Sequence, residues 1–341
     1  MYLNILPLVA FIKTLTFNKL YNGFLLRLSY YFSRLLKRQI LWGKPESLSV
    51  EPTNLCNLKC PECPSGTNNL NRPRLFLSEP IYKTLIDDNK KHLSYLQLYF
   101  QGEPFMHPKL CEFISYAVKR KIFVTTSTNG HFLTTDNCKK IIEAGLQQLI
   151  ISIDGTTQDV FKKYRVGGSL DQVINGIKNL NQAKTNSRKK LPHIAIQFVV
   201  FKHNEHQVKM VKELAKKLRI TDVRLKTAQI EDYENGNELM PQNPKYARYS
   251  KTESGKYVLK RKAKFKCFRV WNASVVSAEG DVLPCCFDKE AKYKYGNLEE
   301  HTLNILWKGS KARTFKARVW ENPKQFDICR NCTEGLSRTW F

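Results

Sequence analysis

Residues 56–63 read CNLKCPEC, which places Cys56, Cys60 and Cys63 in a C-x3-C-x2-C spacing. A short predicted strand, residues 48–51, comes just before this loop. Three thiolates in one loop can hold three corners of a four-iron–four-sulfur cluster, which leaves one iron open to a small-molecule ligand. A zinc site would need a fourth protein ligand nearby, yet residues 64–91 contain no Cys or His. The spacing therefore favours an iron–sulfur cluster over a zinc site closed by a distant His.

Alternating strands and helices follow this loop. Short apolar runs predict strands at 95–100, 122–126, 149–153, 194–201 and 223–227. Helical patterns are expected between them, at 78–92, 109–119, 134–145, 171–183 and 205–218. This order predicts an α/β fold with a parallel sheet and outer helices, either an open sheet or a partial barrel. In both cases ligands gather at the carboxyl ends of the strands.

Polar motifs stand at these strand ends in succession. The second strand is followed by Gln101-Gly102-Glu103-Pro104, and the third by Ser127-Thr128-Asn129-Gly130. The fourth strand ends in ISIDG, which contains Ser152 and Asp154, and YRVGG with Arg165 lies beyond it. Each motif alone is weak, because a Ser or Asp at a strand end is more often a helix cap. Their order after the cysteine loop makes them specific together.

The cysteine loop and these motifs resemble the radical S-adenosylmethionine (SAM) enzymes. That resemblance implies a partial (βα)6 barrel at 47–228, a SAM-binding 4Fe-4S cluster on the three loop cysteines, and a 5′-deoxyadenosyl radical that takes hydrogen from a substrate. It implies that Gly102, Glu103 and Pro104 bind the SAM amino group. Ser152 and Asp154 match a position that contacts ribose and carboxylate, and Arg165 matches one that pairs with the carboxylate. The implied SAM-binding residues are Gly102, Glu103, Pro104, Ser127, Asn129, Ser152, Asp154 and Arg165.

Glu62 departs from the family's pattern, which usually has an aromatic or aliphatic residue near adenine before the last loop cysteine. We therefore expect the backbone at this position, and not its side chain, to contact adenine.

A second set of cysteines lies in residues 267–341, beyond a polar segment, 229–266, that we expect to be a linker. The spacing resembles the SPASM/twitch type of C-terminal module, which implies one auxiliary 4Fe-4S cluster. A four-cysteine zinc site is the alternative. Cys286 is not expected to be a ligand, because it adjoins Cys285, and Asp288 is a weak candidate for a catalytic proton acceptor. The four expected ligands are Cys267, Cys285, Cys329 and Cys332.

Charge is distributed unevenly along the 341 residues: 56 Lys and Arg stand against 30 Asp and Glu, a net charge of +26. The first 45 residues hold seven basic side chains and no acid, interleaved with Leu, Ile, Phe and Tyr. Residues 1–46 therefore predict one or two amphipathic helices, which either contact an anionic membrane surface through residues 1–44 or pack on the barrel with their Leu and Phe buried. A second basic cluster lies at 256–266.

The composition excludes a disordered chain, and the longest apolar run near the start is shorter than the ~20 residues that a membrane-spanning helix needs. Ten cysteines without a recognisable secretory signal indicate a reducing, cytoplasmic compartment, with the inner membrane surface as the alternative site. We expect a radical SAM enzyme of oxidoreductase or maturase type with a reductant such as flavodoxin or ferredoxin. Its substrate would be a peptide or a small molecule such as a carbohydrate. The alternatives are an RNA-modifying radical SAM enzyme and a non-catalytic zinc-bearing nucleic-acid-binding protein.

Overall fold

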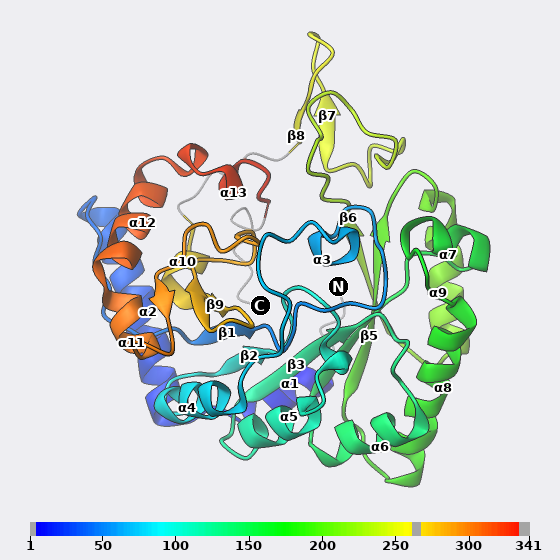
Figure 1. The fold of residues 1–341 in the computed structure, drawn as a ribbon, viewed down its shortest axis with the longest axis horizontal. Coiled ribbons are helices and arrows are strands. Elements are labelled where there is room, and N and C mark those ends of the chain that lie inside the picture. The colour runs from blue at the N-terminus through cyan, green and yellow to red at the C-terminus, as the bar shows by residue number, and fades with distance from the viewer. Residues whose placement is uncertain (1–4, 261–266, 334–341) are drawn as a thin grey trace. The chain divides into compact units, whose positions relative to one another are not determined.

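The chain folds as two units in the computed structural model, which describes residues 5–260 and 267–333. Unit 1 comprises residues 1–55, 70–125 and 263–341, and unit 2 comprises 56–69 and 126–262. Unit 1 therefore combines the two ends of the chain with the first strands, while unit 2 contains the cysteine loop and the later strands. The ribbon is drawn in Figure 1.

The sheet of unit 1 has the order β11-β10-β9-β1-β2-β3. Strands β1 (Ser47–Val50), β2 (Tyr95–Gln97) and β3 (Phe123–Thr128) are parallel, and β3 ends within unit 2. Strand β9 (Ala273–Val276) lies parallel to β1, and β10 (Asp281–Leu283) and β11 (Gly296–Asn297) follow antiparallel. The C-terminal cysteine module therefore continues the sheet that begins with β1.

Helices α4 (Glu79–Asn89) and α5 (Leu110–Val118) connect the first three strands, as predicted. Their apolar faces meet where the rings of Tyr82 and Phe113 stack with centroids 4.0 Å apart. Buried Leu48, Leu96 and Val124 line the strands beside them. At the C-terminal end of unit 1 lie α10 (Arg269–Asn272), α11 (Leu303–Lys308), α12 (Ser310–Glu321), the short 3-10 helix η3 (Pro323–Gln325) and α13 (Asp327–Arg330).

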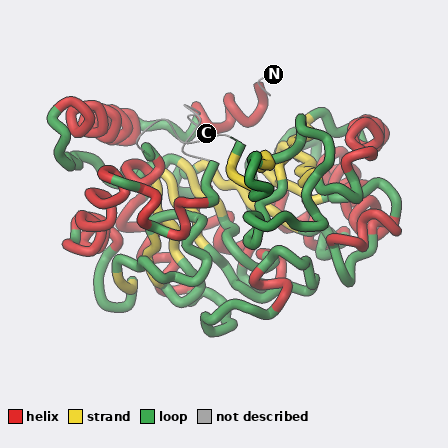
Figure 2. The backbone as a smooth tube through the Cα atoms, turned by 90° about the horizontal axis from the view of Figure 1, so that it is seen from above, coloured by secondary structure: helices red, strands yellow, loops and turns green. Residues whose placement is uncertain are grey.

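The N-terminal segment forms two helices, α1 (Ile5–Ile12) and α2 (Phe17–Leu35). In Figure 2, α1 lies beside the N label, outside the strands. Helix α2 packs on the C-terminal module, where the ring of Tyr30 lies 5.0 Å from Phe268 and 6.0 Å from Trp271 between centroids. No helix among the described residues is long and apolar enough to span a bilayer.

Unit 2 contains the parallel strands β4 (Gln148–Ser152), β5 (His193–Val200) and β6 (Asp222–Thr227) in that order. Helices α6 (Thr135–Glu143), α8 (Leu170–Asn186) and α9 (Val208–Lys217) match the predicted ones. A short helix α7 (Gln158–Tyr164) was not predicted. The parallel strands and intervening helices agree with the predicted βα order.

The segment predicted as a linker holds an antiparallel hairpin of β7 (Tyr249–Lys251) and β8 (Tyr257–Leu259), drawn in yellow in Figure 1. Beneath the hairpin, Ile230, Met240 and Tyr249 form a small core with Phe201 and Ala228. This segment therefore packs on the rest of unit 2 through an apolar core that it shares with Phe201. Its basic residues from Arg261 to Lys266 lie outside the described residues.

Candidate functional site

The cysteine loop of unit 2 turns sharply into the short helix α3 (Pro64–Thr67). Cys63 is its N-cap residue, and the Cys63 amide donates to the Cys60 carbonyl at 3.2 Å. The loop is anchored at its middle, where the Lys59 amide donates to the Val166 carbonyl at 2.9 Å. Gly66 is required by close packing, because a Cβ atom there would lie 2.6 Å from the Cys60 nitrogen. The loop backbone is therefore held by hydrogen bonds within the loop and by one to Val166.

Arg165 joins the cysteine loop to the end of β4. Its Nη1 donates to the Cys60 thiol at 3.8 Å, and its Nε donates to the Asp154 carboxylate at 2.6 Å. Asp154 is fully buried and also accepts the Val199 amide at 2.7 Å. Burial raises the pKa of the Cys60 thiol, and the charge of Arg165 opposes that rise. The structure thus brings together three residues that the sequence assigned to one site.

The third strand end supplies Asn129, which is 5% exposed. Its amide donates to the Asn57 side chain in the cysteine loop at 2.7 Å. His131 fixes this arrangement: its Nε2 accepts the Ser169 amide at 2.8 Å, so in the neutral ring Nδ1 carries the proton and donates to the Asn129 Oδ1 at 3.0 Å. Burial lowers the pKa of His131, which favours that neutral ring. Sequence reasoning missed the positioning role of His131.

The GEP motif lies in unit 1, beyond the end of β2 at Gln97. Gly102 has φ +70°, and a Cβ there would lie 2.5 Å from the Thr53 carbonyl oxygen, so no other residue fits without movement. The Glu103 amide donates to the Leu55 carbonyl at 2.7 Å, one residue before Cys56. The Glu103 carboxylate accepts the Phe105 amide at 3.2 Å and caps the 3-10 helix η1 (Pro104–Met106). The motif is therefore held against the chain that enters the cysteine loop.

A buried ion pair in unit 1 was not predicted. Arg72 donates to both Glu51 carboxylate oxygens at 3.0 Å and to Glu279 at 2.6 Å. Glu51 is fully buried and also accepts the amides of Gln101 at 3.2 Å and Ala278 at 2.9 Å. Burial raises the pKa of Glu51, and Arg72 opposes that rise. This pair connects the end of β1, the start of the GEP motif and the C-terminal module.

The remaining predicted strand-end residues lie in unit 2. Ser127 is half-buried within β3, and Ser152, 7% exposed, ends β4. The Glu62 carboxylate accepts the Glu231 amide at 3.1 Å, so this side chain joins the loop to the segment after β6. That contact gives a physical reason for the unusual Glu before the last loop cysteine.

The C-terminal cysteines are close enough to influence one another's ionisation. Burial raises the pKa of the Cys267, Cys285 and Cys329 thiols, and for Cys329 the value is about 12. Neighbouring thiols add to the effect, Cys332 on Cys285 and Cys286 on both Cys267 and Cys285. A group of half-buried thiols whose thiolate forms would repel one another suits a positively charged centre, which stabilises the thiolates. Among the described residues, no three His, Cys, Asp or Glu side chains are already arranged as a metal site.

Asp288 is buried in this module, with 1% exposed. Its two carboxylate oxygens accept the amides of Lys292 at 2.8 Å and Tyr293 at 2.9 Å. Burial raises the pKa of Asp288, and these amides oppose the rise. Because backbone donors occupy both oxygens, the contacts favour a role in shaping the turn over proton transfer to a substrate.

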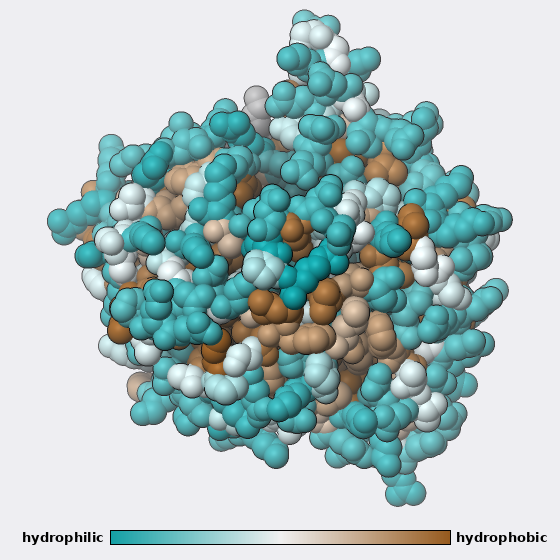
Figure 3. All heavy atoms as spheres, viewed as in Figure 1, coloured by the Kyte–Doolittle hydropathy of each residue, from teal (hydrophilic) through white to brown (hydrophobic). Residues whose placement is uncertain are grey.

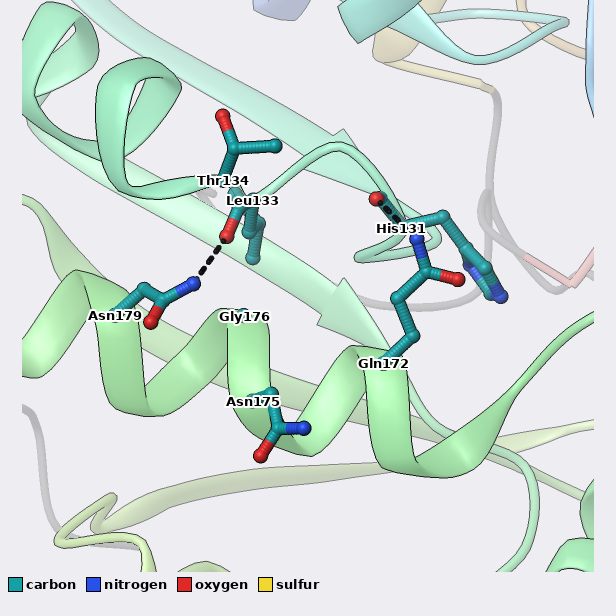
Figure 4. Close-up of a pocket in the computed structure, with 7 residues that line it drawn as sticks. All are labelled: His131, Leu133, Thr134, Gln172, Asn175, Gly176 and Asn179. Atoms are coloured by element: carbon teal, nitrogen blue, oxygen red, sulfur yellow. Dashed lines mark hydrogen bonds between the residues drawn. The ribbon is translucent and has the colours of Figure 1, made fainter.

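A pocket of about 320 Å³ lies elsewhere in unit 2, between the loop after Gly130 and helix α8. Figure 4 shows Gln172 and Asn179 pointing from α8 to the backbone of that loop, where they donate to the carbonyls of His131 at 3.0 Å and Leu133 at 3.1 Å. These amides attach the helix to the loop. None of the predicted cysteine ligands or SAM contacts lines the pocket, so it is not the candidate site.

Two family models match the chain. One, described as the radical SAM superfamily, covers residues 50–215, and the other, an iron–sulfur cluster-binding domain (SPASM), covers residues 267–333.

Three curated relatives illustrate the similarity. An AdoMet-dependent heme synthase of Oleidesulfovibrio alaskensis is 34% identical over 137 residues, 40% of this chain and 35% of that protein. The tungsten-containing aldehyde ferredoxin oxidoreductase cofactor-modifying protein of Pyrococcus furiosus is 25% identical over 79% of this chain and 82% of its own length. Mycofactocin maturase MftC of Mycobacterium tuberculosis is 29% identical over 53% and 45%. The match thus spans about a third to a half of the first and third relatives.

Solved structures share the fold at low sequence identity. BtrN in complex with AdoMet and 2-DOIA has a TM-score of 0.53 at 18% identity, with 86% of this chain and 95% of that chain covered. The protein anSMEcpe with bound AdoMet has a TM-score of 0.61 at 16% identity, over 86% and 92%. SuiB of Streptococcus suis bound to S-adenosylmethionine has a TM-score of 0.62 at 14% identity, over 85% and 71%. These likenesses support the predicted fold class.

Proposed function

Because the chain belongs to the radical SAM superfamily and carries a C-terminal SPASM domain, we propose that it is an enzyme that abstracts a hydrogen atom from its substrate. When bound, SAM and a 4Fe-4S cluster supply the 5′-deoxyadenosyl radical for this step. The observation that carries the proposal is the contact of Arg165 with both Cys60 and Asp154 at the end of β4.

Different residues around this contact would bind the cluster and SAM. Cys56, Cys60 and Cys63 would ligate three irons of the SAM-binding cluster, since their loop supplies three thiols and no further Cys or His nearby. Arg165, whose pKa Asp154 and Cys60 raise against the effect of burial, stays charged and would pair with the SAM carboxylate.

Within unit 2, the Asn129 side chain, held by His131, would be kept in place for a polar contact with SAM. Ser127 and Ser152 would line the same strand ends. In unit 1, Gly102, Glu103 and Pro104 would hold the SAM amino group.

The second cluster would be held by the C-terminal thiols Cys267, Cys285, Cys329 and Cys332. Four thiols can occupy all four corners of one cluster, which leaves no iron for a substrate. Electron transfer is the role that remains, and it fits oxidative or redox-neutral chemistry such as alcohol dehydrogenation or crosslinking in a peptide. The reductant would be a small electron carrier such as flavodoxin or ferredoxin.

We propose two candidate substrate classes. The name mycofactocin maturase and the complex of BtrN with 2-DOIA describe those proteins and not this chain. Both a peptide and a small molecule or carbohydrate fit the proposed chemistry. Residues 1–46 form two helices and no separate globular domain among the described residues. We propose both a peptide and a small or lipid-linked molecule as candidate substrates.

An RNA-modifying radical SAM enzyme is the second candidate, favoured by the net charge of +26. Binding to RNA that weakens steeply with salt would support this candidate. A zinc-bearing nucleic-acid-binding protein would contain zinc in place of iron and sulfide, so metal analysis separates it from both enzymes.

We also propose that the enzyme works in a reducing cytoplasm, where it makes peripheral contact with the inner membrane surface. The charge of residues 1–44 supports that contact: seven basic residues and no acid.

The test is anaerobic incubation of the reconstituted protein with SAM and a strong reductant, followed by chromatography for 5′-deoxyadenosine. We expect 5′-deoxyadenosine from the native sequence. We expect none from the variant with Cys56, Cys60 and Cys63 all changed to Ala. Cleavage of SAM by that triple variant would overturn the proposal.

A further inference from the structure

Helix α2 buries mostly small and polar side chains, together with Leu26 and Tyr30, and exposes most of its large apolar ones. Phe17 is 79% exposed and Leu35 is 74% exposed, although both are large hydrophobic residues. The exposed residues recur at spacings of three and four, which places them on one face of the helix. On that face lie Phe17, Leu20, Tyr21, Phe24, Tyr31 and Leu35, and on the opposite, buried face lie Lys19, Asn22, Gly23, Leu26, Ser29, Tyr30 and Ser33.

Specific contacts within unit 1 hold the helix in this orientation. The Asn22 side chain donates to the Lys44 carbonyl and accepts the Lys44 amide, both at 2.9 Å. Arg27 forms a two-point pair with Glu46 at 2.9 and 3.0 Å. Turning the helix to bury its apolar face would break these bonds and remove Tyr30 from its aromatic neighbours. The contacts of the buried face of α2 therefore keep its apolar face exposed.

Helix α1 extends the same kind of surface. Ile5, Leu8, Val9 and Ile12 are exposed along one side of it. Phe11 fixes the other side, with its ring 6.5 Å from that of Tyr95 and 5.8 Å from that of Phe123. Of the eighteen large hydrophobic residues exposed in the described chain, thirteen lie between Ile5 and Trp42, so exposure is concentrated in this segment. By contrast, hydrophilic side chains cover most of the face drawn in Figure 3.

The positive charge beside this surface favours anionic lipid over a second copy of the chain as its partner. Exposed Lys13, Arg34, Lys37 and Arg38 accompany the apolar residues, and no acid occurs before Glu46. A second copy of the chain would bring the same positive charges into contact, whereas anionic lipid headgroups complement them. Exposed Tyr21, Tyr31 and Trp42 are of the kinds that favour the boundary between water and lipid.

We propose that the apolar face of α1 and α2 lies in the headgroup region of an anionic membrane. The sequence left open whether residues 1–44 contact a membrane or pack on the barrel. The structure shows which face of α2 packs within unit 1 and which face is exposed. This inference rests on the membrane contact named in the proposed function and not on the radical chemistry. Because no described helix can span a bilayer, the helices would lie along its surface.

The docking face and the GEP loop lie at opposite ends of the strands of unit 1. Tyr95 and Phe123, which Phe11 contacts, are the first residues of β2 and β3, whereas Gly102 comes after the carboxyl end of β2. Docking would therefore leave the GEP loop directed away from the lipid. The contact would hold the enzyme at the membrane without opening its site into the bilayer, so a lipid-linked substrate would need an extended headgroup.

The test is co-sedimentation of the full chain with two kinds of vesicle, one of phosphatidylcholine alone and one of equal parts phosphatidylcholine and phosphatidylglycerol. We expect binding to the anionic vesicles that weakens with salt. Leu20→Glu with Phe24→Glu should reduce that binding at least about tenfold, because charge enters the apolar face. Arg34→Gln with Arg38→Gln should reduce it about tenfold or more, because two basic groups are lost. Ile305→Glu is the control, since Ile305 is as exposed as Leu20, at 57%, but lies on α11.

The results of these experiments distinguish an anionic membrane from a second copy of the chain as the partner. A full chain that stays in the supernatant with both vesicles, or a Leu20/Phe24 double variant that binds like the native sequence, would refute membrane docking. Equal binding to both vesicles would refute the role of anionic lipid. If analytical ultracentrifugation without vesicles shows a dimer that the Leu20/Phe24 variant converts to monomer, the face joins two copies and the proposal fails. SAM cleavage by these variants in solution should be unchanged, so failure of docking is distinct from failure of the proposed function.

Discussion

At the scale of single residues, Arg72 is the clearest structural finding, because its side chain is 5% exposed and its two partners are carboxylates. Its Nε also donates to the Lys289 carbonyl at 2.8 Å in the C-terminal module. A charge at such depth is tolerated only when its hydrogen bonds are complete. Within unit 1, Arg72 thus connects the end of β1 to the C-terminal module.

Replacing Arg72 by Met should destabilise the protein by about 3–5 kcal/mol, because Glu51 would stay buried without its counter-charge. Urea unfolding of the anaerobic protein measures this loss. Arg318→Met is the matched control: Arg318 bonds to Gln325 at the surface, so its replacement should cost about 0–1 kcal/mol. Equal losses in the two variants would contradict the role assigned to Arg72.

For Arg165 we propose a different role, in binding SAM. Arg165→Ala should weaken SAM binding about 10- to 100-fold, since a charge-assisted contact worth roughly 1.5–3 kcal/mol is removed. Glu103→Ala should have a similar effect. Iron content should be unchanged in both, and Arg224→Ala, which removes another Arg of unit 2, should leave the SAM titration as it is. Native-like titration curves for both Arg165→Ala and Glu103→Ala would show that the assigned contacts are wrong.

At the scale of elements, paired side chains connect the starts of neighbouring strands. His193 and Asp222 are the first residues of β5 and β6, and the His193 Nε2 lies 3.0 Å from the Asp222 carboxylate. Arg224 donates to the same carboxylate at 2.7 Å. Burial alone would raise the pKa of Asp222, but these two donors lower it from 3.8 to about 2.

This lowered pKa predicts a pH-dependent contribution to stability. The folded protein binds the Asp222 proton more weakly than the unfolded chain, so the contribution is complete above pH ~4 and is lost as the pH falls toward ~2. Asp222→Asn should therefore cost up to about 2 kcal/mol near pH 7, and progressively less below pH ~4. Urea unfolding at several pH values measures the difference between the two proteins. A difference that grows on acidification would contradict this assignment.

The packing of α2 can be tested through its aromatic residues. Tyr30→Ala removes a ring that lies against Phe268, Trp271 and Trp320, and should cost about 3 kcal/mol. Tyr21→Ala on the exposed face should cost less than about 1 kcal/mol. Thermal unfolding compares the two. A larger loss from Tyr21→Ala would mean that α2 packs through its other face.

At the scale of the whole molecule, the two cysteine sets predict two 4Fe-4S clusters, or about eight irons in all. Changing Cys56, Cys60 and Cys63 to Ala should halve the iron and end SAM cleavage. Changing Cys267, Cys285, Cys329 and Cys332 should also halve the iron, leave some uncoupled SAM cleavage and end substrate turnover. Iron and sulfide analysis of anaerobic protein measures both effects. Unchanged iron in the second variant would point to Cys286 as a ligand, because it lies among these thiols.

The local pattern of the sequence was enough to predict the βα order, the cysteine loop and the succession of polar strand ends. Hydrophobic periodicity reports which residues are buried in each element, and parallel strands bring their carboxyl ends to one edge. The sequence assigned Arg165 and Asp154 to the same site, but it did not predict the ion pair between them. The matched family models agree with these predictions.

Only the tertiary structure revealed the Arg72 pair, the role of His131, the pairing of β9 with β1 and the direction of α2. Glu51 and Glu279 are separated by more than two hundred residues, so no local pattern connects them. The sequence of α2 shows that one face is apolar, but periodicity cannot tell which face meets the protein. That choice depends on partners at Lys44, Glu46 and Trp271, which bond or pack with the polar face of the helix and leave the apolar face exposed. Such contacts between distant segments exist only once the chain has folded.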